Sequence, residues 1–178
     1  MPLDWNIHYA GWMIDDGLPG RRVGESFDWE VEFWSKNLTR TTEQIKSATP
    51  LPDYGYRIVG ELFHVSEQAC LLDFGLKVFG ERTQVPAKCK QGDYVAGNIG
   101  LGFLHGRLYP PEITFEALNR NWHVNSIQAD MTPYISNPDN PKYFFRDESR
   151  IHYESVLFTT RYKVHDYILQ CSVSPTVQ

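Results

Sequence analysis

Hydrophobic and polar residues alternate along several stretches of this 178-residue chain, most clearly in FDWEVEFW at residues 27–34. Up to Phe33 every second position is aromatic or aliphatic, and the acidic residues Asp28, Glu30 and Glu32 stand between them. Alternation with a period of two is typical of a β-strand that buries one face and exposes the other. Because burial favours aromatic side chains and disfavours carboxylates, we expect the acidic side of this strand to face water.

The same alternation predicts further strands, whereas helical periodicity is nearly absent. A short helix is expected only at residues 42–48, where the prolines that follow end it. The proline-rich segment 136–150 is expected to be a loop. The predicted strands are, in order, 27–34, 56–65, 69–80, 92–106, one centred on Trp122 and Val124, 151–162, and 167–173, the last two forming a terminal hairpin.

This pattern predicts an all-β fold. Short strands with regularly spaced turns are typical of a sandwich or a barrel, and the glycines inside the predicted strands, such as Gly60 and Gly75, favour a curved barrel. At 178 residues the chain suits one domain, and 42% hydrophobic residues suffice for a core. We therefore expect residues 1–178 to form a single, mostly antiparallel barrel with extra N- and C-terminal strands and at most one or two short helices.

Residues 56–104 resemble the first strands of an OB-fold. The resemblance is carried by a strand with an internal glycine (RIVGELFHV), then LLDFG, then the Gly92–Asp93 turn before a further strand. It implies an OB-like core. It also raises an alternative function, the binding of single-stranded nucleic acid through aromatic and basic side chains. The residues that would serve this function are Phe74, Lys77, Phe79, Arg82, Lys88 and Lys90.

The distribution of charge favours a protein partner over nucleic acid. The net charge is −5, and the whole excess lies in residues 1–35, which hold seven acidic residues and two arginines. A confined acidic surface suits a basic protein, although it can also be only the solvated side of a strand. In composition the chain is similar to small bacterial proteins of the immunity type, which neutralise a basic toxin. The predicted partner-binding residues are Asp28, Glu30, Glu32, Trp34 and Trp12.

The remaining chemistry-bearing residues form no recognisable catalytic motif. The cysteines Cys70, Cys89 and Cys171 are widely spaced, so each is expected to be a reduced core residue in a cytoplasmic protein. The six histidines are scattered, so neither a metal site nor another cofactor is expected. No apolar stretch is long enough to span a membrane. We expect a non-catalytic binding protein, with a small-ligand-binding barrel or an enzyme as the third hypothesis.

Overall fold

β-Structure predominates in the described residues, with 55% of them in strands and 7% in helical turns, which confirms the all-β prediction. The fold comes from a computed structural model. It describes residues 4–35, 37–104, 113, 118, 120–138, 140, 142–160 and 166–173.

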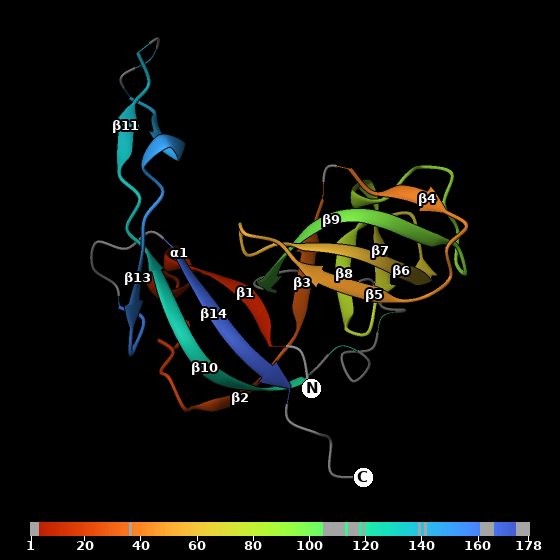
Figure 1. The fold of residues 1–178 in the computed structure, drawn as a ribbon, viewed down its shortest axis with the longest axis horizontal. Coiled ribbons are helices and arrows are strands. Elements are labelled where there is room, and N and C mark those ends of the chain that lie inside the picture. Colours follow the sequence, from red (N-terminus) through yellow and green to blue (C-terminus); the bar gives the residue numbers. More distant parts are fainter. Residues whose placement is uncertain are drawn as a thin grey trace.

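The described residues contain one α-helix, α1 (Gly11–Asp15), and two single-turn 3-10 helices, η1 (Arg82–Gln84) and η3 (Glu148–Arg150). Figure 1 shows these elements along the chain. The strands are β1 (Trp5–Ala10), β2 (Ser26–Trp29), β3 (Val31–Trp34), β4 (Thr39–Thr41), β5 (Ser47–Pro50), β6 (Tyr56–Val65), β7 (Ala69–Asp73), β8 (Lys77–Glu81), β9 (Tyr94–Phe103), β10 (Arg120–Asp130), β11 (Tyr134–Ser136), β12 (Phe144–Arg146), β13 (Tyr153–Val156) and β14 (Asp166–Val173).

Five of these strands close into a barrel. β6 pairs with β7, and β7 pairs with β8, both antiparallel. β8 runs parallel to β3, which pairs with β9, and β9 returns to β6. The predicted barrel is therefore confirmed, and all of its neighbouring pairs except β3–β8 are antiparallel. β4 and β5 extend it at β9 and β6, respectively.

A second, curved sheet packs beside the barrel (Figure 1). Its strands run in the order β13-β10-β14-β1, and β2 pairs with the opposite end of β10 from β13. A parallel bridge between His8 of β1 and Gly102 of β9 joins this sheet to the barrel. The extra N- and C-terminal strands expected from the sequence therefore meet in one sheet.

One hydrophobic core continues from the barrel into the second sheet. Trp5 of β1 contacts Tyr56 of β6, with ring centroids 5.2 Å apart. On the other side, Phe103 of β9 contacts Trp122 of β10 edge to face, at 6.3 Å. Trp122 is fully buried, as expected. Aromatic pairs of this kind bury large apolar areas and thereby hold the two sheets together.

The segment FDWEVEFW forms two strands instead of one. β2 pairs with β10 of the second sheet, whereas β3 pairs with β8 and β9 of the barrel. The chain changes sheets at Glu30, which belongs to neither strand. Val31 and Phe33 are buried and Asp28 is exposed, as predicted, whereas Phe27, Trp29, Glu30 and Glu32 are all half-buried. The predicted burial pattern is therefore confirmed only in part, and the single strand is wrong.

Several other element predictions need correction. Strand 56–65 is confirmed, but 69–80 is a hairpin of β7 and β8 that turns at Gly75, whose φ of 104° suits glycine. Residues 42–48 form no helix, since β5 begins at Ser47.

The C-terminal part of the chain also departs from the prediction. Within segment 136–150, β12 pairs with β11 to form a ribbon that projects from the fold (Figure 1). The predicted terminal hairpin is wrong, because β13 and β14 each pair with β10, which lies between them. The turn expected between them falls on residues 161–165, outside the described residues.

Candidate functional site

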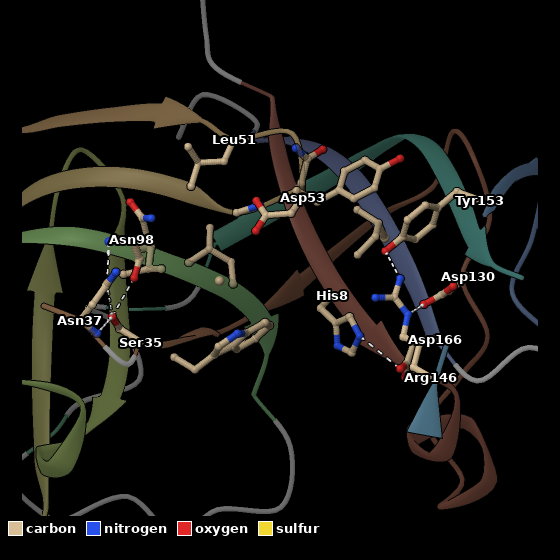
Figure 2. A pocket seen from close by; sticks show the side chains of 18 residues that line it. His8, Ser35, Asn37, Leu51, Asp53, Asn98, Asp130, Arg146, Tyr153 and Asp166 are labelled. Atoms are coloured by element: carbon tan, nitrogen blue, oxygen red, sulfur yellow. Dashed lines mark hydrogen bonds and ion pairs between the residues drawn. The ribbon is translucent and has the colours of Figure 1, made fainter. Parts of the chain in front are cut away.

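An open cleft of about 510 Å³ lies between the barrel and the second sheet. The barrel contributes β3, β9 and the loop that connects β5 to β6. The second sheet contributes β1, the start of β14 and the end of β10, together with Arg146 of β12 and Tyr153 of β13. The volume is in the range of pockets that bind small molecules. We treat this cleft as the candidate site (Figure 2).

Trp34 provides an aromatic surface in the cleft. It lies opposite Gly100 in the β3–β9 register, and its indole covers Gly100 and Gly102. A Cβ at Gly100 would come within 2.3 Å of the indole, so only glycine allows this contact. The His8 ring meets Trp34 edge to face, with centroids 5.8 Å apart. The indole is held by its neighbours yet remains 44% exposed.

A histidine–aspartate pair forms part of the wall on the second sheet. The antiparallel register of β1 and β14 places His8 opposite Ile168 and Ala10 opposite Asp166. His8 and Asp166 are therefore diagonal neighbours on one face of the sheet, and the His8 Nε2 lies 3.5 Å from a carboxylate oxygen of Asp166. Both side chains are about one-third exposed. This pair can donate and accept hydrogen bonds beside the Trp34 ring.

Arg146 connects the projecting ribbon to the same wall. Its Nε lies 2.8 Å from a carboxylate oxygen of Asp130, and its Nη2 donates a hydrogen bond of 2.8 Å to the Tyr153 hydroxyl. Burial disfavours the charged guanidinium, but the hydrogen bonds and charge interactions with Asp130 and Tyr153 together outweigh burial and raise the pKa of Arg146. Burial and the nearby Asp130 raise the pKa of Tyr153. Arg146 therefore stays charged and Tyr153 stays neutral at physiological pH.

The loop between β5 and β6 faces this wall. Its backbone closes through a hydrogen bond from the Leu51 N–H to the Gly55 carbonyl, and the Asp53 carboxylate accepts from the Gly55 N–H at 3.3 Å. Tyr54 has a φ of 62°, which is uncommon for a residue other than glycine. Its ring packs against Tyr153, with centroids 4.9 Å apart. The contact with Tyr153 holds the loop next to the second sheet and leaves Asp53 exposed.

Polar groups from the barrel complete the cleft. The Ser35 hydroxyl donates to the Asn98 carbonyl at 2.7 Å, and the Asn98 N–H donates to the Asn37 side chain at 3.0 Å. These bonds order the chain after β3 next to Trp34. In Figure 2, Asn98 lies on one side and His8 and Tyr153 on the other, with Asp53 between them.

The predicted partner-binding residues do not gather on one surface. Asp28 is exposed on β2, where its carboxylate accepts from Asn121 at 2.9 Å. Glu30 and Glu32 are half-buried. Trp12 is 51% exposed on α1, and Figure 1 shows α1 and β2 at opposite ends of the second sheet. The expected exposure of Trp34 and Trp12 is confirmed, and their role in partner binding remains a prediction.

The residues proposed for nucleic-acid binding lack exposed aromatic rings. Phe74 and Phe79 are both buried, so neither can stack on a base. Arg82 donates to the carbonyls of Val85, Pro86, Ala87 and Cys89 and so supports the following loop. Lys77 lies over the ring of Phe63, whereas Lys88 and Lys90 are exposed. What remains of the predicted surface is basic but not aromatic.

Sequence reasoning missed most of the cleft. It proposed Trp34 for a protein partner and did not propose Asp53, Asp166 or Arg146 at all. These residues come from separate elements and share no local motif, so only pairing between strands brings them together. Within the described residues, no group of three or more histidine, cysteine or acidic side chains is placed to hold a metal ion. In the same part of the chain, no helix has the length and apolar character needed to cross a membrane.

Comparisons of the chain with known protein families, with curated proteins and with solved structures gave no match.

Proposed function

We propose that this protein binds a small polar ligand in the cleft between the barrel and the second sheet. The observation that carries the proposal is Trp34, a partly exposed indole that is seated on Gly100 and surrounded by polar side chains. Ligand sites commonly combine an apolar surface with a few well-placed polar groups. Exposing a large indole is unfavourable in an unbound protein, and a ligand stacked on it would recover that free energy.

The construction of the cleft supports binding to a preformed site. Trp34 is held by two strands, the His8–Asp166 pair by two more, and Arg146 by Asp130 and Tyr153. Rigid elements lose little conformational entropy when a ligand binds, which favours affinity. Tyr54 adds a backbone conformation of the strained kind that often occurs at functional sites.

We also propose that the barrel is an OB-like barrel with a changed strand order. In an OB-fold the first strand pairs with the second and the fourth, and the third runs parallel to the fifth. Counted from Tyr56, the strands β6, β7, β8 and β9 take the first four places with these pairings. β3 takes the fifth place, parallel to β8 and antiparallel to β9, although it comes first in the chain.

The ligand proposal can be tested with the indole N–H signals of the isotope-labelled protein. The chain has five tryptophans, and the variants Trp34→Phe and Trp12→Phe assign the two exposed ones. In a screen of small polar compounds, we expect at least one class to shift the Trp34 signal and leave the Trp12 signal in place. If no compound shifts the Trp34 signal, or if every compound that shifts it also shifts the Trp12 signal equally, the cleft is not the binding site.

A protein partner is the second candidate, and exposed Trp12 is the observation that favours it. Trp12 is half-exposed on α1, and Asp15 and Asp16 are exposed on the same short segment. An aromatic residue among acids suits a basic partner, as when an immunity protein neutralises a toxin. A Trp12→Ala variant should then weaken capture of the partner. Replacement of Asp28, Glu30 and Glu32 by lysine, away from α1, should abolish capture if the partner instead binds the acidic strand. Equal capture by all variants would argue against both surfaces.

A further inference from the structure

We infer that the ligand of the cleft is a neutral carbohydrate, with one sugar ring stacked on Trp34. This inference rests on the proposed binding function and specifies the class of ligand. It follows from three properties of the cleft: its charge, its mixture of hydrogen-bond donors and acceptors, and the presence of an apolar surface beside polar groups.

The charge of the cleft disfavours anionic ligands. Its charged residues are Arg146 and the carboxylates of Asp53, Asp130 and Asp166, in addition to His8. Asp130 neutralises Arg146 at 2.8 Å, so the guanidinium is already paired. Asp166 and Asp53 then leave the remaining cleft with an excess of negative charge. A phosphate group would be repelled by this arrangement, which argues against nucleotides and single-stranded nucleic acid.

The polar groups include both donors and acceptors at close quarters. Asn98 offers a carboxamide whose side chain makes no hydrogen bond to another described residue. His8 offers a ring nitrogen, and Asp53 has a carboxylate oxygen beyond the one that accepts from Gly55. A sugar hydroxyl both donates and accepts, so a polyhydroxylated ring satisfies such a mixed set. A cationic ligand would use only the acceptors and leave the donors unpaired.

The shape of the aromatic surface suits a sugar ring. A pyranose has one face of C–H groups and a rim of hydroxyls, and it packs its apolar face against a flat indole. Trp34 supplies such a surface, fixed on Gly100 and Gly102, and the His8 ring meets it edge to face. The polar groups of Asp53 and Asn98 lie in the same cleft, where they can reach the rim of a stacked ring.

The experiment measures binding of defined probes to the full-length protein by calorimetry and by the indole N–H signals. The neutral probes are cellotriose, maltotriose, triacetylchitotriose and mannotriose; choline is the cationic probe and adenosine monophosphate the anionic one. We expect at least one trisaccharide to bind and to shift the Trp34 signal. Trp34→Ala should weaken its affinity by at least about tenfold, the loss expected when a single stacking contact is removed.

Two further variants separate the ligand contacts from effects on folding. Asp53→Asn keeps the side-chain acceptor for the Gly55 N–H but removes the negative charge. This variant should also bind the trisaccharide with lower affinity. Trp12→Ala removes the other exposed tryptophan outside the cleft, and it should leave the affinity unchanged. Thermal unfolding of each variant identifies any loss that comes from misfolding.

Two outcomes would overturn the inference, and they differ in what they leave standing. If choline or adenosine monophosphate shifts Trp34 while no trisaccharide does, the carbohydrate inference is wrong and the cleft remains a binding site. If no probe shifts Trp34, and the wider screen of polar compounds also leaves it unmoved, both the carbohydrate inference and the proposed function fail.

Discussion

Trp34 lies directly over Gly100, with the indole occupying the space where a side chain at position 100 would begin. The neighbouring residue on β3, Phe33, makes the same kind of contact on the inner face of the barrel, where its ring covers Gly80 of β8. Successive residues of a strand point to opposite faces. One strand therefore places two aromatic rings on the glycines of its two neighbours, one ring in the core and one in the cleft.

The contact between Trp34 and Gly100 predicts a non-additive pair of substitutions. Gly100→Ala places a methyl group within 2.3 Å of the indole and should destabilise the protein by about 1–3 kcal/mol. In a Trp34→Ala background the same substitution meets no ring, so it should cost markedly less. Urea unfolding of the four proteins of this cycle provides the measurement. Equal costs in both backgrounds would show that the indole does not occupy this position.

Asp93 predicts a stability that depends on pH. Its carboxylate accepts from the Lys90 N–H at 3.0 Å and from Arg40 at 2.7 Å, and these contacts, the Lys90 bond foremost, lower the pKa of Asp93. The unfolded chain has a pKa of about 3.9 for aspartate. The contribution of the carboxylate is therefore present above about pH 4 and is lost as the pH falls through the lower folded-state pKa.

The substitution Asp93→Asn should consequently destabilise the protein at neutral pH, and the loss of stability should be smaller at acidic pH. The midpoint of urea unfolding, compared between the wild type and the variant at about pH 7 and about pH 3, measures this difference. Asp53→Asn, on an exposed loop, serves as a control for the loss of one charge. If the unfolding midpoints of Asp93→Asn and the wild type differ by the same amount at both values of pH, the Asp93 carboxylate is not the source of this stability.

The three cysteines should be unreactive in the folded protein. Cys70, Cys89 and Cys171 are buried and free. Burial raises the pKa of Cys70 to about 12 and also raises the pKa values of the other two, so little thiolate forms near neutral pH. Titration with a thiol reagent at about pH 8 should detect none in the native protein and three after denaturation. Rapid reaction of one native thiol would contradict this prediction.

Arg21 should contribute to stability through contacts with aromatic rings. Its guanidinium is buried, lies 3.9 Å from the centroid of the Phe27 ring, and pairs with Glu25 at 3.5 Å. Removing it in Arg21→Ala should cost about 2–4 kcal/mol, because both packing and a buried charge pair are lost. Arg21→Lys should retain only part of the stability that Arg21→Ala loses, since an ammonium group lacks the planar surface that stacks on Phe27. Chemical unfolding of both variants tests this order, and full recovery by lysine would contradict it.

The accuracy of the sequence predictions followed how locally each feature is encoded. Strand 56–65 was found because it contains alternating residues and is followed by a polar turn at Ser66, whose N–H donates to the Ala69 carbonyl. The hairpin inside 69–80 was missed because β7 and most of β8 are buried on both faces. Their sequences consequently form one nearly continuous apolar run, in which Asp73 and Gly75 mark the turn.

The candidate site was less predictable than the fold. The position of Trp34 on the acidic side of FDWEVEFW indicated an exposed indole, and the structure confirms the exposure. The sequence contained no signal for its partners, because His8 and Asp166 meet only through the pairing of β1 with β14, near opposite ends of the chain. Arg146 reaches the cleft only because a segment expected to be a loop forms the ribbon of β11 and β12.

The amino-acid sequence by itself determined that this chain is β-structure, because alternation is a local property that the hydrophobic effect acts on directly. Tertiary structure decided the closure of the barrel, the parallel pairing of β3 with β8, and the transfer of the chain to a second sheet at Glu30. It also decided the cleft. These features depend on the register between segments far apart in the chain, and that register is set by the packing of the whole core.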